Sequence, residues 1–142
     1  MKSLITSILF TLILSIGTGF KAEAQRLFDA VPEHVQFQNK LIEDVFAMNA
    51  GSSVDIKFSQ NFRITGIIKS NKKVYENLQT VVIECSNYNN AKLFVSKTID
   101  TDKSIKYVGR IISRTSQDGF EIKSDIASSS LKKINLKDMI VE

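Results

Sequence analysis

Cysteine, histidine, proline and tryptophan are almost missing from this chain of 142 residues, which has one each of the first three and no tryptophan. The single cysteine, Cys85, excludes an intramolecular disulfide. The single histidine, His34, argues against a site built from several histidine and cysteine ligands and leaves a serine nucleophile only one imidazole. Nothing near His34 in the sequence would orient a catalytic imidazole, so we interpret it as a solvated side chain. We therefore expect no enzyme, no metal site and no cofactor.

An excess of one charge sign is also absent. The chain has 19 basic and 15 acidic side chains, and they are scattered along its length. The only basic doublets are Lys72-Lys73 and Lys132-Lys133. A nucleic-acid-binding surface would gather basic residues on one face with aromatic residues between them. The sequence thus predicts no nucleic-acid partner.

The first 24 residues have the composition of a cleavable export signal. Lys2 precedes an almost uncharged stretch rich in leucine and isoleucine, and Ala22-Glu23-Ala24 places small residues where a signal peptidase reads them. We predict cleavage between Ala24 and Gln25. The alternative is an uncleaved anchor, but the interrupted apolar run falls short of the roughly 20 residues that cross a bilayer comfortably. We expect a secreted or periplasmic protein with no stable membrane anchor after cleavage.

Residues 25–142 would then form a single β-rich domain, because this length suits one domain. The pattern in residues 32–51 predicts one amphipathic helix of about four turns, with a proline suited to its first turn and a glycine suited to its end. The apolar side chains that form its stripe are Phe37, Leu41, Val45 and Met48.

From residue 54 onward the apolar period changes to two, which predicts short antiparallel strands. Residues 92–114 are typical of a hairpin with a polar turn at residues 100–104. Residues 78–85 are densely apolar, so we expect a central strand covered on both faces. Residues 115–119 are predicted as a turn and residues 127–130 as a loop.

The fold class predicted from these patterns is α+β and mainly β. One N-terminal amphipathic helix would precede a curled antiparallel sheet or small barrel of six to seven strands. A flat two-layer arrangement is the alternative. Bulky side chains expected to fill the barrel are Phe58, Phe62, Phe94, Tyr107 and Phe120.

Four residues are candidates for a binding surface. Tyr88 and Asn89 lie in a predicted turn, where tyrosine is a common interface residue and asparagine tolerates left-handed backbone. Cys85 precedes this turn and is either an exposed thiol or, like most free cysteines, a small buried hydrophobe. Arg110 follows Gly109 in the hairpin, where glycine permits close backbone approach and the arginine can pair with a carboxylate across the sheet.

Several segments together suggest a relationship. They are Ala-Glu-Ala-Gln at residues 22–25, the run at residues 75–83, Tyr-Val-Gly-Arg-Ile-Ile at residues 107–112, and the last six residues. With them the chain resembles small secreted proteins of the Bacteroidota to which no function is assigned. The resemblance implies an envelope or extracellular setting and brings no catalytic residues.

We therefore expect an exported, non-catalytic binding module for protein–protein interaction, of which a protease inhibitor is one form. Its partner would be a protein or small ligand in the cell envelope or medium. The alternative is an envelope carrier that holds a small apolar ligand inside a β-barrel.

Overall fold

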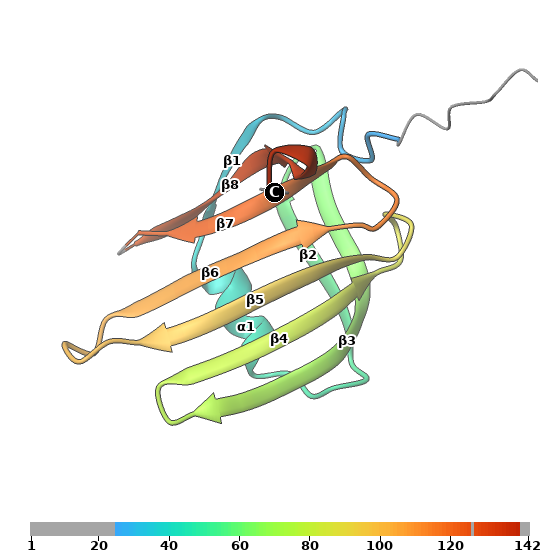
Figure 1. Ribbon diagram of the computed structural model, residues 1–142. Helices are drawn as coiled ribbons and strands as arrows, with labels where there is room; N and C mark the ends of the chain where they lie inside the picture. The colour runs from blue at the N-terminus through green and yellow to red at the C-terminus, as the bar shows by residue number, and fades with distance from the viewer. Residues whose placement is uncertain (1–24, 126, 140–142) are drawn as a thin grey trace, which may run out of the picture.

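The computed structural model describes residues 25–125 and 127–139; the predicted export signal, residue 126 and residues 140–142 lie outside the described part. Eight antiparallel strands form one sheet (Figure 1). In chain order the elements are β1 (His34–Gln38), α1 (Lys40–Phe46), β2 (Ser53–Ser59), β3 (Phe62–Tyr75), β4 (Leu78–Cys85), β5 (Ala91–Ile99), β6 (Ile105–Ile112), β7 (Asp118–Ser124), β8 (Ser128–Asn135) and the 3-10 helix η1 (Leu136–Met139).

The sheet curls into a nearly closed barrel. Its strand order is β1-β8-β7-β6-β5-β4-β3-β2, so β1 and β2 are the two edges. Phe37 of β1 and Phe58 of β2 pack edge to face across the remaining gap, with ring centroids 5.0 Å apart. The predicted curled antiparallel sheet is therefore confirmed, with eight strands in place of six or seven.

The hairpin predicted at residues 92–114 is confirmed as β5 and β6. At its turn Asp102 accepts hydrogen bonds from the Ser104 amide at 2.9 Å and from the Ser104 hydroxyl at 2.6 Å. Lys103 takes the left-handed conformation, with φ of 67°. Because these bonds join near neighbours in the sequence, the turn could be predicted from the sequence alone.

The helix predicted over residues 32–51 is wrong in its first half. Residues His34–Gln38 are strand β1, and only Lys40–Phe46 form a helix. Val35 and Phe37 are buried and alternate with exposed neighbours, which is the period of a strand. The helical spacing joined Phe37 of the strand to Leu41 and Val45 of the helix, so two elements were read as one.

The strand that the sequence did not predict is β1. Its pairing with β8 also corrects the predicted loop at residues 127–130. β1 pairs with β8, with Val35 opposite Leu131 and Phe37 opposite Ser129. The predicted loop at residues 127–130 therefore belongs largely to β8, which begins at Ser128. Three serines form a strand here because the ladder to β1 satisfies their backbone groups.

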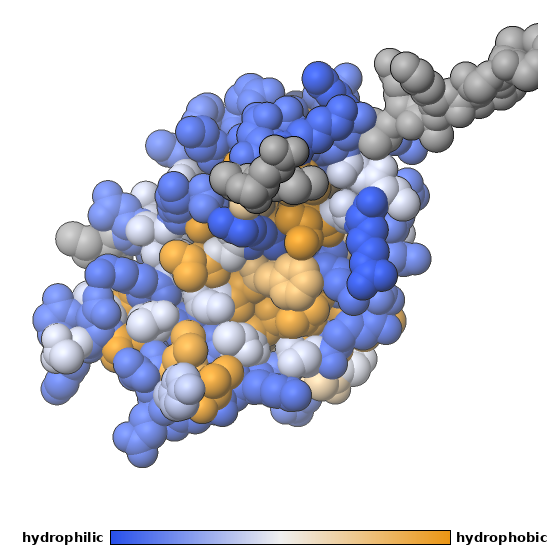
Figure 2. All heavy atoms as spheres, viewed as in Figure 1, coloured by the Kyte–Doolittle hydropathy of each residue, from blue (hydrophilic) through white to orange (hydrophobic). Residues whose placement is uncertain are grey.

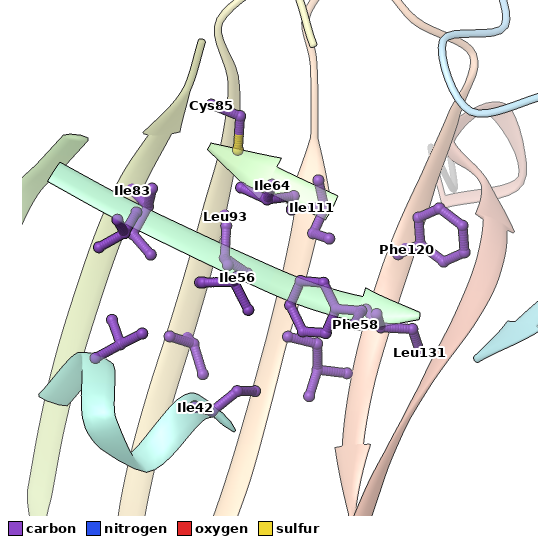
Figure 3. Packing of buried hydrophobic residues seen from close by; sticks show 14 of the residues in the cluster. Ile42, Ile56, Phe58, Ile64, Ile83, Cys85, Leu93, Ile111, Phe120 and Leu131 are labelled. Carbon is purple, nitrogen blue, oxygen red and sulfur yellow. The ribbon is translucent and has the colours of Figure 1, made fainter. Parts of the chain in front are cut away.

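Side chains from the strands meet inside the barrel (Figure 3). Phe62 lies at the centre of an aromatic cluster and contacts four other rings, with centroid distances from 5.1 to 6.1 Å. Phe28, from the segment before β1, closes one end and is fully buried. Helix α1 lies at the other end, where Ile42, Val45 and Phe46 are buried (Figure 1).

Asp118 holds the segment that carries Phe28. Its carboxylate accepts hydrogen bonds from the Leu27 amide at 2.8 Å and the Phe28 amide at 3.0 Å, and the Ser116 hydroxyl also donates to it. At the other end the Asn71 amide donates to the carbonyl oxygens of Phe46 and Met48, where α1 ends.

Within residues 25–125 and 127–139, no helix has the length and apolar character to span a membrane.

Candidate binding face

The described residues contain no group of three histidine, cysteine or carboxylate side chains placed to hold a metal ion. His34 is exposed at the start of β1, as predicted. The features of interest lie instead on the outer surface of the barrel, where apolar side chains are exposed.

Phe94 is on the outer face, and its expected place in the core is wrong. Leu93 and Val95 beside it point inward and are buried, so the alternation along β5 turns Phe94 outward, where it is 39% exposed. Val108 on β6 points the same way and is 53% exposed.

The expectation that β4 is fully covered on both faces is also wrong, since its outward residue Val82 is only half-buried.

Two hollows flank Phe94. One is about 360 Å³ and is lined by Val108, Arg110 and Glu121, while the other is about 600 Å³ and is lined by Asn89, Arg114 and Leu136. Phe94 and Ile112 line both hollows. We call the surface formed by Phe94, Val108, Ile112 and Leu136 the Phe94 face.

Figure 2 shows this region as an apolar patch surrounded by hydrophilic residues, on the side of the molecule where β5 and β6 face the viewer. The hollows have the size of ordinary ligand or side-chain pockets, which begin at about 300 Å³. An exposed apolar patch rimmed by polar residues is typical of an interaction site.

The rim of the Phe94 face has more basic than acidic groups. Arg110 and Lys123 share one carboxylate, that of Glu121, at 3.9 and 3.2 Å. Lys92 and Arg114 line the larger hollow and have no ion-pair partner within the described part of the chain. The face therefore carries surplus positive charge beside its apolar centre.

The structure separates the four predicted binding residues into two pairs. Asn89 and Arg110 line the two hollows of the Phe94 face. Asn89 takes the left-handed conformation expected for it, with φ of 47°. The predicted pairing of Arg110 with a carboxylate across the sheet is confirmed, because Glu121 lies on the neighbouring strand β7.

Cys85 and Tyr88 point into the barrel instead. Cys85 is fully buried, so the interpretation as a small buried hydrophobe is confirmed and the interpretation as an exposed thiol is wrong. Burial raises the pKa of its thiol to about 12. The Tyr88 ring packs on Phe28 with centroids 4.9 Å apart, and burial raises the pKa of the Tyr88 hydroxyl. Cys85 is therefore unavailable for a surface contact, whereas Tyr88 is half-buried with its ring against the core.

None of the four residues that define this face was predicted as a site residue from the sequence: Phe94, Val108, Ile112 and Leu136. A signal for Phe94 was present, because Leu93 and Val95 already form the apolar phase of that strand. Leu136 gave no such signal, since it reaches the face only through the path of the chain after β8.

Comparisons with protein-family models, with curated proteins and with solved structures find no match to this chain. The resemblance to secreted proteins of the Bacteroidota stays a prediction. Any functional assignment therefore depends on the physical properties of the Phe94 face.

Proposed function

We propose that this chain is an exported, non-catalytic binding module that docks a segment of a partner protein on the Phe94 face. The observation that carries the proposal is an exposed phenylalanine with a hollow on each side. Aromatic side chains of this kind supply much of the energy of protein interfaces. A partner would insert apolar side chains into the two hollows and cover the Phe94 ring.

The surplus of basic groups defines the chemistry of the partner segment. Lys92 and Arg114 have no carboxylate partner in the described part of the chain, and Arg110 shares Glu121 with Lys123. Acidic groups on the partner would complement this rim and favour correct orientation. We therefore propose a segment in which apolar side chains alternate with aspartate or glutamate.

Selection of random peptides displayed on phage tests this proposal even though the partner is unidentified. The full chain is immobilised, and the selected peptides are expected to combine an apolar anchor with acidic neighbours. Phe94→Ser is expected to weaken their binding by at least about tenfold, because it removes a central aromatic contact. Arg110→Glu is expected to select peptides with fewer acidic residues.

Val74→Ser is the matched control, since Val74 is an exposed apolar residue outside the Phe94 face. This variant should bind the selected peptides as the unsubstituted chain does. The proposal fails if no peptide family is enriched, or if the enriched peptides bind the Phe94→Ser variant equally well.

The nearly closed barrel is also compatible with a carrier of a small apolar ligand, the second candidate function. Against it stands the aromatic cluster around Phe62, whose rings occupy the barrel interior. Mass spectrometry of compounds released by denaturing the purified protein separates the two functions. A stoichiometric apolar compound would favour the carrier.

A further inference from the structure

A second exposed surface lies at the tips of two hairpins, away from the Phe94 face. The β3–β4 and β5–β6 hairpins extend side by side past α1 (Figure 1). The Ile99 amide donates a hydrogen bond of 2.9 Å to the Asn77 carbonyl oxygen, which joins the two tips. We call residues 72–79 and 97–106 the hairpin tips.

Large apolar side chains are exposed at the hairpin tips. Tyr75 is 67% exposed, Val74 47% and Ile99 38%. They occupy the ends of projecting hairpins, and the hollow between the tips is only about 230 Å³. This arrangement presents the side chains to a surface better than it encloses a ligand.

The hairpin tips carry more basic than acidic side chains. Asp100 pairs with Lys106 at 2.5 Å, and Asp102 accepts two hydrogen bonds from Ser104. Glu76 is the remaining acidic residue of the tips. Among the described residues no carboxylate pairs with the other lysines of the tips, which are Lys72, Lys73, Lys97 and Lys103.

We propose that the hairpin tips dock reversibly on an anionic lipid surface. Val74, Tyr75 and Ile99 enter the interfacial layer, and the free lysines contact acidic headgroups. Tyrosine suits this layer because its ring is apolar and its hydroxyl remains hydrated. Lysine contributes electrostatic attraction that acts over a short distance and weakens with salt. Such contact requires no membrane-spanning segment.

The absence of tryptophan from the sequence permits a direct test with a single reporter. Tyr75→Trp is made in the full chain and mixed with vesicles of equimolar phosphatidylcholine and phosphatidylglycerol. Its fluorescence is expected to shift to shorter wavelength and to be quenched by brominated lipid. Ile67→Trp, at an exposed apolar residue outside both surfaces, is the matched control and should show neither change.

Charge reversal tests the role of the lysines. Lys72→Glu with Lys73→Glu, added to the Tyr75→Trp chain, is expected to weaken vesicle binding by at least about 25-fold, since each basic residue near an anionic surface contributes about fivefold and the new carboxylates are repelled by it. Lys57→Glu with Lys132→Glu changes the net charge equally but lies outside the hairpin tips, and should leave most of the binding intact.

The residues before Gln25 are the same in every variant, so their contribution cancels in these comparisons. The proposal is overturned if the Tyr75→Trp emission does not respond to anionic vesicles, or if the two charge reversals weaken binding equally. Neither result would affect the peptide selection on the Phe94 face, because the two surfaces have no residue in common.

Discussion

The two faces of strands β5 and β6 differ in what they can do for the protein. On the inner face Leu93 and Ile111 are almost completely buried, whereas on the outer face Phe94 and Val108 remain exposed. Both faces carry large apolar side chains, so composition alone does not distinguish them. The inner face packs against other strands of the barrel. No layer of described residues covers the outer face. Stability should therefore depend on the inner face, and binding on the outer one.

Removing one phenylalanine ring inside the barrel and one outside it gives the largest contrast. Phe62 lies on β3 and belongs to the same buried core as the inner residues of β5 and β6. Phe62→Ala is expected to lower the free energy of unfolding by about 3–5 kcal/mol, because it removes a fully buried ring and leaves a cavity. Phe94→Ala should cost less, about 1–2 kcal/mol, because that residue is 39% exposed and its removal leaves no enclosed cavity. Urea denaturation of the two variants measures both values. Equal losses would show that the two faces contribute alike to stability.

A substitution at Gly109 tests how closely β5 and β6 must approach each other. A Cβ atom at this position would lie 2.3 Å from the Phe94 carbonyl oxygen, which belongs to the backbone and cannot rotate away. Gly109→Ala is expected to push β5 and β6 apart and to cost about 1–3 kcal/mol of unfolding free energy. The measurement is again urea denaturation. Unchanged stability would mean that the ladder tolerates the separation.

Cys85 gives the interior of the barrel a pH dependence. Burial raises the pKa of its thiol from 9.0 to about 12. Between these values the unfolded chain loses the thiol proton and the folded chain keeps it. Stability contributed by the neutral thiol is therefore present below about pH 9 and is lost as the pH rises toward 12.

The expected loss is about 1.4 kcal/mol for each pH unit in this window. Unfolding of the natural chain and of Cys85→Ala is compared at about pH 8 and about pH 10, on either side of the ordinary thiol pKa. Tyrosine and lysine side chains are present in both proteins, so their effects cancel in the difference, except for the smaller part of the raised Tyr88 pKa that is due to Cys85. If the two proteins lose stability in parallel, the thiol is not protected by burial.

Local bonds made the β5–β6 hairpin predictable, whereas distant pairing concealed β1. The turn at residues 100–104 is fixed by contacts between near neighbours, such as Asp102 with Ser104. β1 is a strand because Val35 lies opposite Leu131, far along the chain. Its local alternation consists of only two apolar residues, Val35 and Phe37, and the longer helical spacing outweighed it. Its five residues therefore merged with the helix that follows.

The candidate site was predictable in part for the same reason. Asn89 and Arg110 were found from turn and strand patterns, while residue size placed Phe94 in the core against the alternation of its own strand. Cys85 illustrates the opposite case. It shares the inward phase of Val81 and Ile83, so its burial was readable from the sequence.

Val108→Thr should have the smallest effect on stability and so isolates the outer face. The substitution nearly preserves shape but replaces a methyl group with a hydroxyl group. Because Val108 is exposed, the free energy of unfolding should change by less than about 0.5 kcal/mol. Binding of a selected peptide should weaken about threefold to fivefold, since the hydroxyl must lose water when the Phe94 face is covered. Fluorescence titration with a labelled peptide measures the second value. A large loss of stability with unchanged peptide affinity would reverse the roles assigned to the two faces.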